Sequence, residues 1–398
     1  MNLKNYQLKK KDESRLIIKN KCEELFDKNN NILLEWCTGT GKSYAAINLQ
    51  SRMNSQKTFI CVAEIAHIQN WKDEYIKHGY EYLLESTEIF CYASLKNYAN
   101  QSADLLILDE IHHAWSETRI FLLTSLRVKR VIGLSATLED EHKYLFNDIF
   151  KNMAIYTITM EEAIEMEILP KPKVYLIPLK LDNSKKSETI EFKRGRNINE
   201  IHCDYLQRNS YIYAKNKYPT LNLIIHCTQQ EKYDYLEANY ERARIFKRSG
   251  WLRHGGIRKK FLSDCKTDKI KEICEKLQDD GKRFICFCGS IEQAEEINPG
   301  NSIHSKKESN SILKRFNRRE INSIYAVKKL VEGVNLVDIN AAVIGQLDGT
   351  ERPFIQMTGR SLRAEFPEVY VLFFKNTKDM DYLENVTNNI PSGYIQIL

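Results

Sequence analysis

The chain has 398 residues, which is more than one compact core usually organises and enough for two domains with an insertion. With 42% hydrophobic residues, 28% charged residues, 8 prolines and 16 glycines, its composition is globular and excludes disordered and fibrous classes. The formal net charge of +6 is mildly basic, which suits a polyanionic partner but is also common among ordinary enzymes.

The cysteines and the N-terminus indicate an intracellular environment. The ten cysteines include no C-x-x-C pair, and several lie in apolar runs, where reduced thiols behave as small core residues. The first residues lack the apolar stretch of a signal peptide, and no run approaches the roughly 20 apolar residues of a spanning helix. We therefore expect a cytoplasmic protein that does not enter a membrane.

Short apolar runs recur through the first part of the chain. They are four to six residues long and rich in Ile, Leu and Val, which is typical of strands buried on both faces. These runs cover residues 32–36, 58–63, 105–108 and 131–134, and segments of helical length lie between them, at 44–54 and 68–78. Strands that alternate with helices predict a parallel sheet covered by helices.

The same alternation returns near the C-terminus. Strands are predicted at 283–288, 324–327, 341–344 and 369–374, with a helix at 291–297. We therefore predict an α/β protein with two lobes, at residues 1–168 and 169–398. From about 181 to 264 the chain is polar, basic and rich in tyrosine, with a mostly helical period. We interpret this segment as a mostly helical basic insertion at the front of the second lobe.

A glycine-containing loop follows the first predicted strand, and a helix follows the loop. Its residues are Cys37-Thr38-Gly39-Thr40-Gly41-Lys42-Ser43. Glycines let successive backbone N–H groups point into one concavity that holds phosphate oxygens, and the helix N-terminus adds a favourable dipole. Lys42 would reach the β- and γ-phosphates of ATP, and the Ser43 hydroxyl would ligate Mg²⁺. Trp36 stands where the usual pattern has its first glycine.

An acidic pair, Asp109-Glu110, follows the strand predicted at 105–108. A carboxylate at the carboxyl end of a buried strand lies on the ligand-binding edge of an open α/β sheet. Asp109 would hold Mg²⁺, usually through its water shell, and Glu110 would orient and deprotonate the attacking water. Taken alone, an ordinary turn at the end of a strand explains this pair equally well.

Together, the phosphate loop and the acidic pair resemble the DExH branch of the superfamily 2 helicases, in which Asp109-Glu110-Ile111-His112 is motif II. The other motifs follow in order: Ser135-Ala136-Thr137 as motif III, residues 284–290 as motif IV, 332–336 as motif V, and 356–363, with the pattern Q-x-x-G-R-x-x-R, as motif VI. The likeness spans both lobes. It is nearest to the helicase module of type III restriction subunits and phage recombination helicases, and it implies two RecA-like lobes.

The resemblance implies that residues of motif VI complete the catalytic site from the second lobe. Arg360 and Arg363 are one helical turn apart, so both can face the cleft. Their guanidinium groups would stabilise the negative charge that develops on the γ-phosphate oxygens. Gln356 would pair with His112 across the cleft.

Further residues receive roles from the same resemblance. Ser135 and Thr137 of motif III would couple the nucleotide site to nucleic-acid movement. Gly333 and Asn335 of motif V would contact the nucleotide, although the family usually has Asp where Asn335 stands. Gln7 is a candidate reader of adenine, and the alternative is a polar residue without a role near the N-terminus.

Candidate contacts to nucleic acid lie in both lobes and in the insertion. Hydroxyls and polar groups at loop starts are common phosphate contacts, and here they are Ser94, Ser290, His304 and Ser305. In the insertion, cations alternate with aromatic residues, a pattern that suits single strands; the candidates are Trp251, Arg253, Arg258, Lys259 and Lys260. The alternative is a helical hairpin that only braces the second lobe.

These observations predict an ATP-dependent, Mg²⁺-requiring helicase or translocase that moves along DNA. Three alternatives remain open: an RNA helicase, because the motifs bind sugar-phosphate; an ATP-gated clamp that does not unwind; and the motor subunit of a defence complex. We expect a monomer with nucleic acid as its partner, in the host cytoplasm if the gene belongs to a phage. The presence of Lys42, Glu110, Arg360 and Arg363 together argues against a clamp that lacks hydrolysis.

Overall fold

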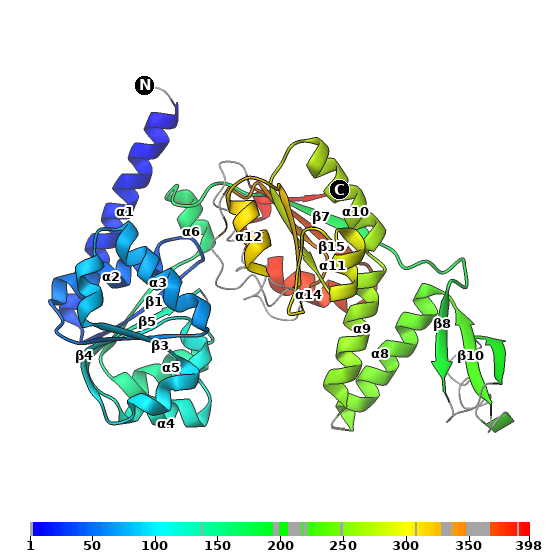
Figure 1. The fold of residues 1–398 in the computed structure, drawn as a ribbon, viewed down its shortest axis with the longest axis horizontal. Coiled ribbons are helices and arrows are strands. Elements are labelled where there is room, and N and C mark those ends of the chain that lie inside the picture. Colours follow the sequence, from blue (N-terminus) through cyan, green and yellow to red (C-terminus); the bar gives the residue numbers. More distant parts are fainter. Residues whose placement is uncertain are drawn as a thin grey trace.

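The computed structural model describes residues 3–136, 138–193, 199–205, 216–217, 221–246, 250–306, 309–327, 336, 338–347, 367–387 and 390–398. These residues form two α/β lobes that lie side by side, each around its own parallel sheet (Figure 1). A pair of helices and a small sheet project from the second lobe, away from the first (Figure 1). The two parallel sheets confirm the predicted α/β class.

The first lobe is built on a six-stranded sheet. Its strands are β1 (Asn31–Trp36), β2 (Thr58–Val62), β3 (Thr87–Cys91), β4 (Ser102–Leu108), β5 (Arg127–Ser135) and β6 (Met153–Ile158). Its helices are α1 (Leu3–Lys28), α2 (Lys42–Met53), α3 (Ile65–Lys77), α4 (Glu117–Ser125), α5 (Asp140–Phe150) and α6 (Met160–Glu165), with short 3₁₀ segments at η1 (Glu81–Ser86), η2 (Tyr92–Tyr98) and η3 (Ile111–Ala114). β1 and β2 are buried along their whole length, as expected for apolar strands covered by helices on both faces.

The order of strands in this sheet brings three sequence motifs to one edge. The strands run β3-β2-β4-β5-β1-β6, and all of the pairings are parallel. β5 therefore lies between β1 and β4. Since parallel strands end at the same edge, the loop after β1, the acidic pair after β4 and Ser135 at the end of β5 become neighbours there.

The second lobe is built on a seven-stranded parallel sheet with the order β12-β13-β11-β14-β15-β7-β16. Its strands are β7 (Lys173–Leu179), β11 (Phe284–Cys288), β12 (Ser302–Ile303), β13 (Ser323–Val327), β14 (Ala341–Ile344), β15 (Glu368–Phe374) and β16 (Ile395–Ile397). Its helical segments are α10 (Thr267–Asp279), α11 (Ile291–Ile297), α12 (Ser309–Asn317), α14 (Lys378–Thr387) and η5 (Ser392–Tyr394). β7 precedes the insertion in sequence but pairs with β15. The chain therefore leaves this sheet to form the insertion and then returns to the same sheet.

The insertion contains more strand than its sequence predicts. Two helices, α8 (Gln229–Ile245) and α9 (Trp251–Asp264), form a hairpin, which agrees with the predicted helical period. They follow three strands, β8 (Glu188–Phe192), β9 (Glu200–Asp204) and β10 (Asn222–Cys227), in a sheet of order β8-β10-β9. The expectation of a mostly helical insertion therefore missed this sheet. Its strands are short, and buried residues occur only at some positions of β8 and β10 and at none of β9, so they lack the continuous apolar runs of the lobe strands.

Buried ionic contacts fix the hairpin to the second lobe. The Arg258 guanidinium on α9 is 2.6 Å from the Glu237 carboxylate on α8 and donates a 2.8 Å hydrogen bond to the hydroxyl of Tyr382 on α14. Two residues after the end of α9, Lys266 Nζ lies 2.7 Å from the Asp379 carboxylate, and both side chains are buried. Since such paired charges are costly to separate in a protein interior, the hairpin is a firm extension of the lobe.

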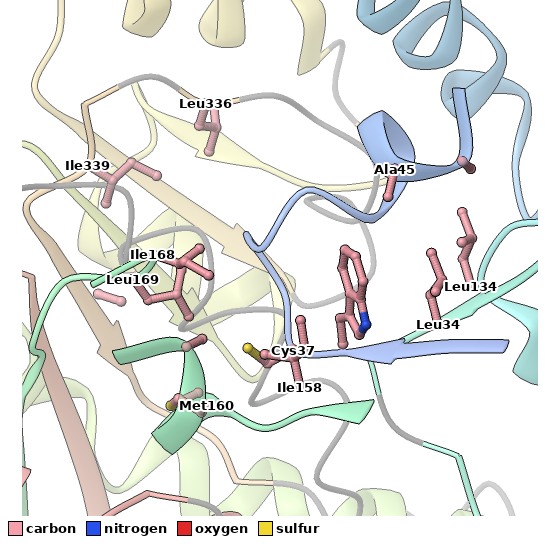
Figure 2. Close-up of a cluster of buried hydrophobic side chains, with 14 of the residues drawn as sticks. Leu34, Cys37, Ala45, Leu134, Ile158, Met160, Ile168, Leu169, Leu336 and Ile339 are labelled. Atoms are coloured by element: carbon pink, nitrogen blue, oxygen red, sulfur yellow. The ribbon is translucent and has the colours of Figure 1, made fainter. Parts of the chain in front are cut away.

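An apolar cluster continues from the phosphate-loop strand into the second lobe. It includes Leu34 on β1, Ile158 at the end of β6, Met160 at the start of α6, and Ile168 and Leu169 in the connection to β7. Leu336 and Ile339 of the second lobe belong to the same cluster (Figure 2). The connection between the lobes is therefore packed rather than solvated. Among the helices of the described residues, none combines the length and the apolar character needed to cross a lipid bilayer.

Candidate nucleotide and nucleic-acid site

The loop between β1 and α2 has the backbone of a phosphate cradle. Gly39 and Gly41 have φ angles of 91° and 96°, in the left-handed region that side chains other than glycine rarely adopt. The Thr40 hydroxyl closes the turn by donating a 2.7 Å hydrogen bond to the carbonyl of Cys37. α2 begins at Lys42, so the free N–H groups of its first turn face the loop.

Trp36 does not obstruct this cradle. It is the last residue of β1, its side chain is 1% exposed, and its ring packs edge-on against Tyr156 at 5.4 Å. The side chain thus belongs to the core, and only the backbone contributes to the loop. That backbone carbonyl accepts a 2.8 Å hydrogen bond from Lys42 Nζ, which holds the lysine folded over the loop. A phosphate group would compete with this carbonyl for the ammonium.

The acidic pair lies at the end of β4, and neighbouring side chains and backbone hold it in place. Asp109 donates its N–H to the carbonyl of Cys61 at 2.9 Å and accepts a 2.8 Å hydrogen bond from Trp71 Nε1 on one carboxylate oxygen. The Tyr92 hydroxyl donates to the Asp109 carbonyl at 3.0 Å. Burial, reinforced by the nearby carboxylates, raises the pKa of Tyr92 well above its usual value, so the hydroxyl remains a donor.

Glu110 has an unusual backbone conformation. Its φ of 45° lies in the left-handed region, which is rare for a residue other than glycine and marks a position that the surrounding structure enforces. Its carboxylate lies 3.4 Å from His112 Nδ1. This geometry turns the chain away from the strand direction directly after Asp109, so the two neighbouring carboxylates can serve different partners.

Ser135 lies at the same sheet edge, between the phosphate loop and the acidic pair. It is fully buried at the end of β5, where it pairs in register with Glu35 of β1. The Glu35 carboxylate accepts hydrogen bonds from the Leu138 N–H at 2.9 Å and from the Thr157 hydroxyl at 3.1 Å, and it lies 2.9 Å from Lys143 Nζ. The segment after Ser135 is thereby tied to the strand that leads into the phosphate loop.

The side chains at this edge suit a hard cation that is shared with nucleotide phosphates. Ser43 offers a hydroxyl oxygen and Asp109 a carboxylate oxygen, the donor types that Mg²⁺ prefers. Within the described residues there is no cluster of three or more His, Cys, Asp or Glu side chains arranged to hold a metal.

Several predicted site residues lie outside the described residues. They are Thr137 of motif III, Gly333 and Asn335 of motif V, and Gln356, Arg360 and Arg363 of motif VI. Gln7 lies within α1, but its side chain is also outside the description. Their roles stay predictions from the sequence.

The candidate phosphate contacts of the lobes differ in accessibility. Ser305 is exposed and Ser94 half-buried. Ser290 is buried, and its hydroxyl caps α11 by accepting the Gln293 N–H at 3.1 Å. His304 is also buried, with Nε2 2.7 Å from Glu295 Oε1. The last two side chains have structural partners, and their positions do not support the predicted phosphate contacts.

The candidate contacts of the insertion divide in the same way. Arg258 is 1% exposed and paired inside the hairpin, so its position supports the bracing alternative and not a phosphate contact. Lys260 is 2.6 Å from Glu292, and Lys259 lies over the Tyr382 ring at 5.3 Å. Arg253 is exposed at the outer end of α9, and Trp251 is 37% exposed beside the Tyr240 ring. Among the described residues of the insertion, the outer end of the hairpin presents an exposed cation, Arg253, and a partly exposed indole, Trp251.

Sequence reasoning did not assign three residues that shape this site. Trp71 and Tyr92 hold Asp109, and Glu35 anchors the segment after Ser135. Glu35 offered one signal, because a lone carboxylate inside an apolar strand needs a buried partner.

Comparisons with known proteins agree with this arrangement. Residues 265–365 match the family model described as the helicase conserved C-terminal domain. The DNA 3'-5' translocase XPB2 of Sulfurisphaera tokodaii is 25% identical over 371 residues, which cover 87% of this chain and 77% of that protein.

A solved structure shares the fold. The structure of S. cerevisiae Dbp5 bound to RNA and ADP BeF3 aligns with a TM-score of 0.54 and 12% identity, over 93% of this chain and 85% of that chain. The Pyrococcus furiosus Hef helicase domain covers 93% of this chain and 96% of its own, with a TM-score of 0.47 and 14% identity.

The family follows from independent observations. The first lobe places a phosphate loop, an acidic pair and motif III at one sheet edge. The second lobe matches the helicase C-terminal model, and a DNA translocase aligns across most of the chain. Together these observations support a superfamily 2 helicase.

Proposed function

We propose that this protein is an ATP-dependent DNA translocase or helicase of the DExH branch. The observation that carries the proposal is the convergence of Lys42, Asp109-Glu110 and Ser135 at one edge of the first sheet, because ATP-driven motors need phosphate binding, hydrolysis and coupling in one place. Similarity to a DNA 3'-5' translocase along 87% of the chain supports DNA as the substrate.

The first lobe would bind ATP and prepare the attacking water. Lys42 would leave the Trp36 carbonyl and pair with the β- and γ-phosphates, while loop N–H groups hold the phosphate oxygens. Ser43 and Asp109 would hold Mg²⁺, which supplies charge neutralisation on the phosphates. Glu110 would orient the water and accept its proton.

The second lobe would complete the site on closure. We place the lobes at residues 1–168 and 169–398. Arg360 and Arg363 would bring positive charge to the γ-phosphate. This charge would stabilise the transferring phosphate only after the cleft closes. Gln356 would pair with His112, which lies beside Glu110 in the first lobe. Gly333 and Asn335 would line the nucleotide from the same side.

Single-stranded nucleic acid would meet the exposed loop residues of both lobes and the outer end of the hairpin. Trp251 and Arg253 lie there; the partly exposed indole suits base stacking, and the exposed guanidinium suits phosphate contact. The buried contacts that fix the hairpin would keep this surface in a constant position relative to the second lobe.

The proposal is tested by measuring ATP hydrolysis in parallel with single-stranded DNA, duplex DNA, forked DNA and RNA. We expect DNA to stimulate hydrolysis, because bound strand closes the cleft and brings Arg360 to the γ-phosphate. Glu110→Gln is the matched control for contaminating ATPase activity. Equal rates with and without every nucleic acid would refute a motor, and stimulation by RNA alone would reassign the substrate.

A further inference from the structure

Trp71 is the residue of α3 that reaches the acidic pair. Its indole is 2% exposed, and its Nε1 donates a 2.8 Å hydrogen bond to Oδ2 of Asp109. The indole nitrogen can only donate, and the carboxylate can only accept when ionised, so the direction of this hydrogen bond is unambiguous. Within the described contacts, the Trp71 indole N–H donates to no other acceptor. It thus binds the carboxylate that is predicted to hold the metal.

This hydrogen bond restricts how Asp109 can turn. A carboxylate at the end of a strand can rotate about its last side-chain bond, which is a broad, soft torsion. With Oδ2 held by Trp71, rotation would break a hydrogen bond to an ionised group, a stronger class than one between neutral groups. The other oxygen, Oδ1, then points in a fixed direction, in which it can contact the metal or its water shell.

Trp71 is itself held firmly. One helical turn further along α3, Tyr75 is fully buried, with its ring tilted against Trp71 at 6.3 Å between centroids. The Tyr75 hydroxyl donates to Oε1 of Gln50, and Gln50 Nε2 donates to the Thr87 hydroxyl at 2.8 Å. Gln50 lies on α2, the helix that begins at the phosphate loop. Through buried polar groups, α3 therefore contacts Asp109 of the acidic pair and the helix that follows the phosphate loop.

We propose that Trp71 is a positioning residue for hydrolysis, which acts by presenting the Asp109 carboxylate to the metal of the metal–nucleotide complex. The inference rests on the proposed function, since it requires that Asp109 hold Mg²⁺. Groups that orient a metal ligand from behind commonly change metal affinity by about 10–100-fold when they are removed. Among the described contacts, Trp71 on α3 supplies a hydrogen bond of this kind to the Asp109 carboxylate.

The test is the gain in nucleotide affinity that Mg²⁺ confers, measured with a fluorescent non-hydrolysable ATP analogue with Mg²⁺ and with EDTA. In Trp71→Phe, which keeps a ring but lacks the N–H, we expect this gain to fall by about 10-fold, with affinity in EDTA unchanged. Tyr75→Phe is the matched control: it removes a polar group from the same helix face and should leave the Mg²⁺-dependent gain intact while lowering the melting temperature.

A second variant separates the hydrogen bond from packing. Replacing Trp71 with 3-benzothienylalanine keeps the size of the side chain and substitutes sulfur for N–H, and it should reproduce the effect of Trp71→Phe with a near-native melting temperature. An unchanged Mg²⁺-dependent gain in this variant would overturn the role of Trp71. A wild-type protein whose nucleotide affinity ignores Mg²⁺ would instead overturn the proposed ATP site itself.

Discussion

The carboxylate of Glu35 accepts a 2.9 Å hydrogen bond from the backbone N–H of Leu138, which joins two segments that are far apart in the sequence. Glu35 directly precedes Trp36 at the start of the phosphate loop, and Leu138 follows motif III. The same carboxylate pairs with Lys143 of α5. Burial lowers the pKa of Lys143, but the carboxylates of Glu35 and Asp140 outweigh it and hold that pKa above its ordinary value. A buried anion therefore links the loop strand to the segment that is predicted to couple hydrolysis to movement.

Replacing Glu35 should destabilise the first lobe. Glu35→Ala leaves the Leu138 N–H without a partner in a buried position, and we expect the free energy of unfolding to fall by about 1–3 kcal/mol. Denaturant unfolding followed by tryptophan fluorescence measures this. Asp140→Asn removes only the exposed partner of Lys143 and serves as the control. Equal stability of Glu35→Ala and the wild type would show that the anchor is not significant.

Two substitutions at the nucleotide site should separate binding from hydrolysis. Lys42→Ala removes the cation that contacts the phosphates, so we expect nucleotide binding to be lost. Glu110→Gln keeps the shape of the side chain but cannot accept the proton of the attacking water, so ATP should bind normally and scarcely be hydrolysed. Equilibrium binding and steady-state hydrolysis on the same preparations distinguish the two. Full turnover by Glu110→Gln would contradict the proposed role of this residue.

Arg360 should act on the rate of hydrolysis and not on binding. Arg360→Ala is expected to keep ATP affinity near that of the wild type and to slow DNA-stimulated hydrolysis by about 10³-fold, the effect typical of an arginine that stabilises transferring phosphate. Arg360→Lys should not restore the rate, because an ammonium lacks the planar donor pair. A large loss of ATP affinity in Arg360→Ala would place this arginine in ground-state binding instead.

Arg258 and Arg253 lie on the same helix and should respond in opposite ways. Arg258→Ala leaves Glu237 without its partner, so we expect about 3 kcal/mol of lost stability, seen as a lower melting temperature. Arg253→Ala should melt like the wild type and instead reduce the slope of log affinity for single-stranded DNA against log salt by about 0.7. Binding titrations at three salt concentrations, with melting curves on the same samples, provide both quantities. A normal salt slope in Arg253→Ala would remove this end of the hairpin from the nucleic-acid path.

The sequence alone predicted the features that depend on residues close together in the chain. The most apolar strands of both lobes, the glycine loop after β1 and the acidic pair after β4 are local patterns, and the signals that predict them act over a few residues.

Only the tertiary structure decided how individual side chains are used. Arg258 looked like its neighbours in a basic run, yet the hairpin buries it against Glu237, while Arg253 on the same helix stays in solvent. Trp71 reaches Asp109 only because β2 and β4 are adjacent and α3 packs near the end of β4. Burial and hydrogen bonding between residues far apart in sequence depend on how the elements pack, and no local pattern of residue types encodes that packing.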